Sequence, residues 1–511
     1  MSCAQEGVCS ARSFSTIRSW DVSAIAVTVF LAGVLLILGT RMKTSLDFST
    51  IQGDKLRRPP ILPYSIPYVG HAISLLWKPD EYIESAKQIS PSNIFALRVL
   101  GRQHNVVGSP ALVKKVFEER EAFTKDWSPI QLRLLRKFVA MPSEETDVYM
   151  DILRESLFDS DSQSQSALRQ LMAQLQSSLP DLLSFNPSPI DQEPWERASK
   201  LQLDESHDTA TVDLLTLTQT FLTHVTINSI LSPSLLGQNP DVAPLLSQLS
   251  AGFVALFSGV TRTLPHPSLP KAHIARLQLL QQLTPFCAAL RSAAAGMDPG
   301  PAFRDLLEDG DAVTPLLADL QQRWATLDLS LSGRASAMTL LLWQLNAPHA
   351  LAFWLLVHAL ATPGVADALR AESAPFVRAR RPPKMLGFAQ PVTLRFDERG
   401  LAAKCPVLRC CYLETVRLYG REWWSGRAAT DYVVVEGKGL SWFLKAGEWV
   451  HVPFWLANKD EGLFHPDPSA WRWERHIDYV KAVMCGEGTR VEDQVFDRSE
   501  FTPAIHFITE S

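Results

Sequence analysis

The stretch "LRCCYLETVRLYG", residues 408–420, places two opposite charges, Glu414 and Arg417, in a run that is otherwise apolar enough to be buried. On a helix, residues three apart lie on the same face, so these two side chains can meet. Their apolar neighbours indicate that this face is covered: Tyr412, Leu413, Val416 and Leu418. A covered carboxylate and guanidinium must be paired and hydrogen-bonded, because burial is otherwise costly. We therefore expect a third polar partner from elsewhere in the chain.

The same Glu-x-x-Arg pattern also describes a surface helical ion pair, which contributes only about 0.3 kcal/mol. The context favours the buried alternative. The stretch "FHPDPSAWRWERHID", residues 464–478, follows later in the chain and carries Arg475 after an aromatic, Pro-Asp-Pro segment.

With these two stretches the sequence resembles the cytochrome P450 family, the membrane-anchored haem-thiolate monooxygenases. In that family a Glu-x-x-Arg helix locks to an arginine in a P-E-R-F-like segment. The resemblance implies that Glu414, Arg417 and Arg475 form this lock here, with "WERH" in place of P-E-R-F. It further implies that the trio fixes the fold around the haem without touching substrate. Two arginines suit one carboxylate, because the planar guanidinium binds bidentately.

Other stretches follow the family's order over most of residues 20–480. "FALRVLGRQHNVVGS" predicts two strands about a turn at Gly101, and a helix is expected from Pro110 to about Phe123. Residues 128–380 are almost all helical in pattern. Short strands return in "PVTLRF", "TDYVVVEG" and "EWVHVPF". The expected fold class is mainly α with small β-sheets, a cytochrome P450 fold in one large domain with an N-terminal transmembrane anchor.

Composition limits the partners and the compartment. The 511 residues carry 54 acidic and 49 basic side chains, a net charge of -5, without a dense Lys/Arg stripe, so no nucleic-acid partner is expected. The seven cysteines are odd in number and form no C-x-x-C pair, which is typical of a reduced, cytosol-facing protein.

Residues 22–39, "VSAIAVTVFLAGVLLILG", are uncharged and would span about 27 Å as a helix. No clear cleavage signal follows, so we expect a retained signal anchor in a thin bilayer such as that of the endoplasmic reticulum. More basic residues follow the span than precede it, which favours a single pass with the body in the cytosol. The alternative is a buried core helix.

The expected organisation is a tail at 1–21, a transmembrane helix at 22–39, a basic and Pro-rich linker at 40–70, and a cytochrome P450 domain at 71–511. Within the linker, "KLRRPPILPYSIPYVGH" contains four prolines followed by a glycine. Because proline restricts its own φ and its predecessor, this segment is interpreted as a stiff spacer.

Residues 339–364 form an apolar helical pattern interrupted by Pro348, with the polar residues Asn346 and His349 beside it. One interpretation is a core helix whose polar residues satisfy a kink. The family resemblance suggests instead the oxygen-side catalytic helix, although the usual acid and threonine are absent. The stretch is similar to the branch of sterol 7- and 12-alpha-hydroxylases and prostacyclin synthase, with Asn346 as counterpart, so an isomerase remains an alternative.

Arg427, in "WWSGRAAT", lies where the family often has an arginine that contacts a haem propionate. An exposed strand arginine is the ordinary alternative. Trp423 and Trp424 beside it are expected to pack.

The family's axial cysteine lies in a loop F-x-x-G-x-x-x-C-x-G, and this loop is not found. Cys485 is the only cysteine after the Glu-x-x-Arg helix, and it lacks the required phenylalanine and glycine, so we interpret it as a turn cysteine. Cys410 and Cys411 are expected to pack. No metal ligand is therefore assigned, and the chain resembles a family member with an incomplete C-terminal part. Haem b is the cofactor implied by resemblance, and a chain without this loop is expected to lose it.

Three functional hypotheses follow. The first is a membrane-bound monooxygenase that oxidises a lipophilic substrate, such as a sterol, a terpenoid or another secondary metabolite, with haem iron, molecular oxygen and electrons from NADPH-cytochrome P450 reductase. The second is a related isomerase or dehydratase that needs no reductase. The third is a non-catalytic, truncated remnant.

Overall fold

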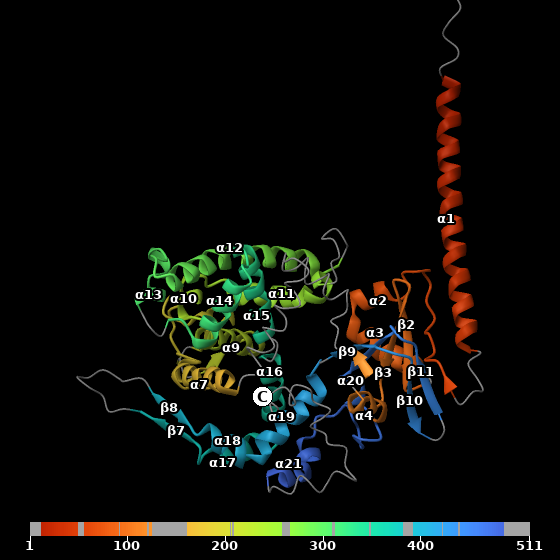
Figure 1. The fold of residues 1–511 in the computed structure, drawn as a ribbon. Coiled ribbons are helices and arrows are strands. Elements are labelled where there is room, and N and C mark those ends of the chain that lie inside the picture. Colours follow the sequence, from red (N-terminus) through yellow and green to blue (C-terminus); the bar gives the residue numbers. More distant parts are fainter. Residues whose placement is uncertain are drawn as a thin grey trace, which may run out of the picture. The chain divides into compact units, whose positions relative to one another are not determined.

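The computed structural model describes residues 12–49, 56–90, 92–119, 122–124, 161–204, 206, 209–257, 266–308, 312–346, 349–381, 392–421, 423–437 and 440–484. The chain divides into two compact units. Unit 1 comprises Met1–Asp126 and Trp424–Pro453, and unit 2 comprises Trp127–Trp423 and Phe454–Ser511. Most of the described residues are helical, and the strands form small sheets (Figure 1). The expected class, mainly α with small β-sheets, is confirmed.

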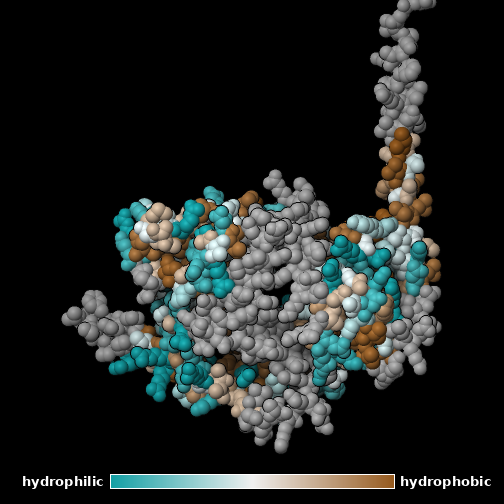
Figure 2. Space-filling model, viewed as in Figure 1, coloured by the Kyte–Doolittle hydropathy of each residue, from teal (hydrophilic) through white to brown (hydrophobic). Residues whose placement is uncertain are grey.

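Unit 1 begins with α1 (Arg12–Ser49), a helix of 38 residues that contains the predicted span 22–39. Its window Ala24–Phe48 is long and apolar enough to cross a membrane, and none of that window is buried. Figure 2 shows apolar side chains along this part of α1. A second stretch of the described chain, Leu331–Ala361, passes the same length and composition test but is partly buried.

The end of α1 is bonded to the chain that follows it. Arg41 Nη1 donates to the carbonyl of Pro63 at 2.5 Å. Thr44 Oγ1 lies 3.0 Å from the carbonyl oxygen of Tyr64 and 3.2 Å from its amide nitrogen, so it can serve as donor and acceptor. These bonds fix the helix end on residues 63–64.

Residues 56–70, which the sequence analysis placed in a linker, pair with the sheets of unit 1. β1 (Leu56–Arg57) runs parallel to β11 (Leu440–Leu444). The amide of Ala96 donates to the carbonyl of Pro60 at 2.8 Å, and Leu62 is buried. The segment is extended, as its prolines predicted, but its carbonyls are used by a neighbouring strand.

The sheets of unit 1 have the strand orders β1-β11-β10 and β2-β3-β12-β9-β4. The strands not yet given bounds are β2 (Ile94–Val99), β3 (Arg102–Val107), β4 (Phe123–Thr124), β9 (Trp423–Ala428), β10 (Tyr432–Gly437) and β12 (Trp449–Pro453). The helices are α2 (Ala72–Trp77), α3 (Pro79–Ile89) and α4 (Pro110–Glu118). The predicted hairpin is present, and α4 begins at the predicted Pro110 with Ser109 as its N-cap. The predicted helix end at Phe123 is wrong, because α4 ends at Glu118 and Phe123 pairs with Ala428 in the sheet.

Unit 2 is a helical body with two small hairpins. Its helices are α7 (Asp161–Ser178), η3 (Leu179–Asp181), α8 (Pro194–Ala198), α9 (Leu214–Ile230), α10 (Pro233–Gln238), α11 (Val242–Phe257), α12 (Leu269–Ala294), η4 (Pro301–Phe303), α13 (Asp305–Glu308), α14 (Pro315–Thr326), α15 (Leu331–Asn346), α16 (His349–Ala361), α17 (Val365–Ser373), α18 (Glu398–Lys404), α19 (Pro406–Tyr419), α20 (Phe454–Ala457), η5 (Trp473–His476) and α21 (Ile477–Met484). Its strands pair as β5 (Gln202–Leu203) with β6 (Ala210–Thr211), and β7 (Val377–Arg380) with β8 (Thr393–Phe396).

The core of unit 2 forms around α15. This helix is buried continuously from Gly333 to Leu342, as its all-round apolar pattern predicts. It packs against α9, α11 and α12. The rings of Phe253 and Trp343 stack with centroids 3.6 Å apart. α16 continues the apolar run and packs against α9 and α19, which brings the Glu-x-x-Arg helix next to the core.

The hairpin turn between β2 and β3 carries a conformational strain that can be measured. Leu100 and Gly101 form a two-residue turn with φ of 48° and 78°, a conformation that favours Asn-Gly. Leu100 is 46% exposed, so its side chain contributes little packing. We expect Leu100→Asn to raise the free energy of unfolding by roughly 0.5–1 kcal/mol. Urea unfolding of the purified chain measures the change.

The control for this prediction is Gly101→Ala. An added Cβ would lie 3.0 Å from the Tyr68 ring at a backbone angle that L-residues disfavour, so this variant should be less stable. A stability loss in Leu100→Asn would contradict the assignment of strain to Leu100.

Candidate functional site

The helix that carries Glu414 is fixed at its start by a carboxylate. α19 begins with Pro406, a residue suited to a first helical turn. Glu372, on α17, accepts hydrogen bonds from the amides of Val407 at 2.9 Å and Leu408 at 3.0 Å. The acid thereby satisfies two amides that have no partner within the helix, and it complements the helix dipole.

Glu414 and Arg417 form a bidentate pair inside unit 2. Arg417 Nε donates to Glu414 Oε2 at 2.7 Å, and Nη2 donates to Oε1 at 2.8 Å. The side chain of Glu414 is 0% exposed and that of Arg417 is 3% exposed. The spacing of three residues therefore makes the buried contact that the apolar surroundings indicated.

Arg417 also connects α19 to the segment after α20. Its Nη1 donates to the carbonyls of Asn458 at 2.6 Å and Pro468 at 2.7 Å. The guanidinium lies 4.6 Å from the centre of the Phe464 ring, within the range of a cation–π contact. One buried side chain thus satisfies backbone carbonyls that are far from it in sequence.

Three further donors approach Glu414. Arg475 Nε lies 3.6 Å from Oε1, the amide of Arg472 donates to Oε1 at 2.8 Å, and His476 Nε2 lies 2.9 Å from Oε2. The structure therefore brings together Glu414, Arg417 and Arg475. Sequence reasoning missed His476 and the Arg472 amide. The available signal was the number of acceptor positions on a carboxylate, which exceeds what one bidentate arginine fills.

These donors decide the charge state of Glu414. Burial raises the pKa of a carboxyl, but the hydrogen bonds from Arg417, His476 and the Arg472 amide outweigh burial and hold the pKa of Glu414 below its ordinary value. The group is therefore ionised at neutral pH, and its charge is compensated within the core.

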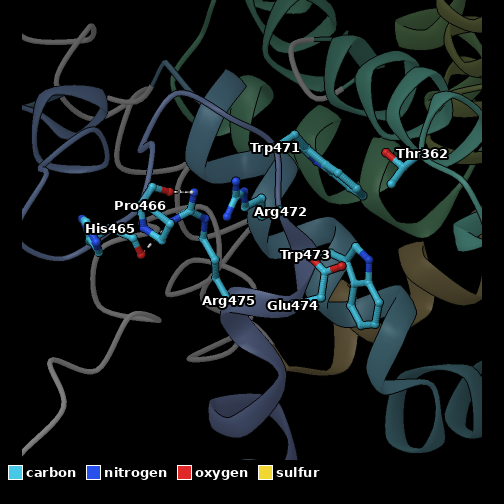
Figure 3. Close-up of a pocket in the computed structure, with 8 residues that line it drawn as sticks. All are labelled: Thr362, His465, Pro466, Trp471, Arg472, Trp473, Glu474 and Arg475. Carbon is cyan, nitrogen blue, oxygen red and sulfur yellow. Dashed lines mark hydrogen bonds between the residues drawn. The ribbon is translucent and has the colours of Figure 1, made fainter.

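The other face of the Arg475 guanidinium organises the chain before η5. Its nitrogens donate to the carbonyls of Phe464, Pro466 and Asp467, the last two at 2.8 and 2.5 Å. Figure 3 shows the guanidinium pointing at this backbone, with the Trp471 ring extending toward Thr362. These residues line an open pocket of about 480 Å³.

Asn346 and His349 lie on the two sides of the helix interruption, and residues 347–348 lie outside the described residues. Asn346 Oδ1 is 2.6 Å from His349 Nδ1 and accepts from Thr223 Oγ1 at 2.5 Å. His349 Nε2 lies 3.2 Å from Thr226 Oγ1. Both threonines belong to α9. The polar atoms are used to join α15, α16 and α9, which supports the interpretation that they satisfy the break.

Arg427 lies on β9 in unit 1, with its guanidinium 6.0 Å from the centre of the Trp449 ring. Trp424, on the opposite face of the strand, packs against Phe117 and Phe123. Trp423 packs against Trp455 in unit 2. The two tryptophans therefore pack, as expected, while Arg427 stays partly exposed and suits a carboxylate ligand.

The described cysteines do not supply a thiolate ligand for haem. They are Cys287, Cys405, Cys410 and Cys411, and all four are buried. Burial raises the pKa of the Cys287, Cys410 and Cys411 thiols to about 12, and that of Cys405 also rises. Cys485 lies outside the described residues. The donor set thus fits the carboxylates of a haem, through Arg427, but not its axial sulfur.

The helical body, the small sheets and the buried Glu-x-x-Arg lock define a cytochrome P450 fold. The chain is similar to the solved structure described as retinoic acid bound cyanobacterial CYP120A1, with a TM-score of 0.50 and 18% sequence identity over 83% of this chain and 82% of that chain. At this identity the likeness shows the fold alone. No protein-family model and no curated protein matches the chain.

The buried lock predicts a large effect of Glu414→Gln. The amide keeps the shape of the side chain but leaves the Arg417 charge in the core without its anion. We expect a loss of about 3–5 kcal/mol in the free energy of unfolding. Urea unfolding measures it, and the rate of limited proteolysis provides a second readout if the variant is poorly stable.

A matched control exists on α17. Asp367 and Arg370 have the same three-residue spacing and a 2.8 Å contact, but their side chains are 84% and 71% exposed. Asp367→Asn should change stability by no more than about 0.5 kcal/mol. Equal effects of the two substitutions would contradict the assigned role of burial.

His349 predicts a pH dependence. Burial lowers the pKa of His349 from 6.5 to about 4. As pH falls below 6.5 the unfolded chain takes up the proton while the folded chain does not, so stability is full above 6.5 and declines toward pH 4, by about 3 kcal/mol. His349→Gln cannot titrate and should lose less stability over this range. Parallel stability curves for the two proteins would contradict the prediction.

Proposed function

We propose that this protein is a membrane-anchored member of the cytochrome P450 family that oxidises a lipophilic small molecule with haem and molecular oxygen. The observation that carries the proposal is the buried contact of Glu414 with Arg417 and Arg475 within a P450 fold. That contact is the feature the family resemblance assigned to these positions. A surface ion pair would not have explained the second arginine.

The proposed substrate class is lipophilic. The similar solved structure holds retinoic acid, an apolar ligand with a carboxylate. The apolar surface of α1 would keep the enzyme at a bilayer, where such molecules accumulate. We propose a sterol, a terpenoid or another secondary metabolite as substrate, the endoplasmic reticulum membrane as location, and NADPH-cytochrome P450 reductase as electron donor.

The residues of this chain would divide the work between holding and supporting the cofactor. Haem with a thiolate ligand supplies the activation of molecular oxygen. Arg427 would bind a haem carboxylate as a charge-assisted donor. Glu414, Arg417 and Arg475 would hold the backbone of residues 458–475 in place without contacting substrate. Of the cysteines outside the described residues, Cys485 is the one that follows the Glu-x-x-Arg helix, so the test addresses this position.

A second candidate function is an isomerase or dehydratase that needs no reductase. It is favoured by the helix interruption, because α15 and α16 contain no acidic residue and their Asn346 and His349 bond to each other and to α9. A proton-delivery pair of the usual family type is therefore not provided by these two helices. Conversion of substrate without NADPH and reductase would select this candidate over the monooxygenase.

The test is the absorbance of the full chain purified from haem-supplemented cells. We expect a haem Soret band and, after reduction, the shifted carbon monoxide band of a thiolate-ligated haem. Cys485→Ser should abolish that shift, while the buried Cys287→Ser serves as control and should retain it. A folded chain without any haem absorbance would overturn the proposed function and favour a non-catalytic role.

A further inference from the structure

One face of the five-stranded sheet in unit 1 carries a row of polar side chains. Successive residues of a strand point to opposite faces, so Ser425 and Arg427 share one face of β9, and Trp449 and His451 share one face of β12. β12 lies between β9 and β3 in the sheet, and Trp449 is paired with His104 of β3. The contacts below place these five residues on the same face.

Ser425, His451 and His104 form a continuous hydrogen-bonded chain across three strands. Ser425 Oγ lies 2.7 Å from His451 Nδ1, and His451 Nε2 lies 2.9 Å from His104 Nδ1. The two imidazoles are stacked with an interplanar angle of 7°. The chain joins residues that are more than three hundred positions apart, and it leads toward the strand that holds Arg427.

The direction of this chain follows from its buried end. Burial lowers the pKa of His104 to about 4 and that of His451 well below its ordinary value, so each neutral ring carries one N–H at pH 7. His104 Nε2 is buried and has no hydrogen-bond partner among the residues described. A dry N–H is less tolerable than a dry lone pair, so the hydrogen of His104 belongs on Nδ1.

The remaining hydrogens are then determined. His104 Nδ1–H donates to His451 Nε2, and His451 must carry its own hydrogen on Nδ1, where it donates to Ser425 Oγ. Ser425 therefore accepts within the chain and places its hydroxyl hydrogen outside it. A hydroxyl donor and a guanidinium two residues apart on one strand face are the pair of donors that a carboxylate accepts.

We propose that Ser425 and Arg427 together bind one carboxylate of the haem, and that His451 and His104 are positioning residues that set the direction of the Ser425 hydroxyl. This inference rests on the proposed function. It assigns to the haem carboxylate a second donor and a supporting chain that the sequence analysis, which considered Arg427 alone, did not contain.

The first test needs no ligand. Nitrogen-15 spectra of the full chain with labelled histidine distinguish the two imidazole tautomers, and His451→Gln assigns the signal. We expect His451 and His104 in the Nδ1–H form at pH 7. A His451 signal of the Nε2–H form would reverse the chain and overturn the proposal, whatever the chain binds.

The second test compares haemin with haemin dimethyl ester, which lacks the free carboxylates, in titrations of the haem-free full chain. Ser425→Ala should weaken binding of haemin about tenfold and leave binding of the ester unchanged, because only the acid gains the charge-assisted bond. Ser425→Thr keeps a hydroxyl and should retain most of the affinity. Ser441→Ala, on β11 of the same unit, is the matched control and should have no effect.

The outcomes separate the two levels of inference. If haemin binds and Ser425→Ala weakens both porphyrins equally, or neither, the assignment of Ser425 is wrong while the proposed function stands. If the wild-type chain binds neither porphyrin, both are overturned. Thermal unfolding of each variant shows whether a loss of binding reflects a loss of fold.

Discussion

The ionised carboxylate of Glu414, enclosed in the core of unit 2, is the constraint on which the surrounding structure depends. An ion in that position is tolerated only when every acceptor position is used, and here two arginines, a histidine and a backbone amide converge on it. Each donor comes from a segment that must therefore stop in one place. The arginines then use their remaining nitrogens on carbonyls of residues 458–470, so an irregular stretch without its own ladder of hydrogen bonds is held by side chains.

Local patterns predicted the parts of the fold that local chemistry determines. The pairing of Glu414 with Arg417 follows from helical spacing, and the β2–β3 hairpin follows from the turn at Gly101. His476 and the threonines that bond Asn346 and His349 could not be predicted, because they depend on how distant helices meet. The residues from 56 onward look like a spacer for a similar reason. Their extended backbone is evident from the prolines, whereas the strand that uses it begins at Leu440.

The two polar clusters of the chain solve the problem of burial in different ways. Around Glu414 a full charge is retained and neutralised by cations. At His104 and His451 the rings lose their charge, since burial lowers their pKa, and their direction of hydrogen bonding becomes the useful property. The first arrangement stabilises a backbone, and the second can orient a single donor.

The bonds between the end of α1 and residues 63–64 have a mechanical consequence. A helix that spans a bilayer changes its tilt when the hydrocarbon thickness changes. A flexible tether would absorb that rotation, but Arg41 and Thr44 transmit it to the backbone of Pro63 and Tyr64. For an anchored protein, the orientation of unit 1 at the lipid surface would then vary with the composition of the surrounding bilayer.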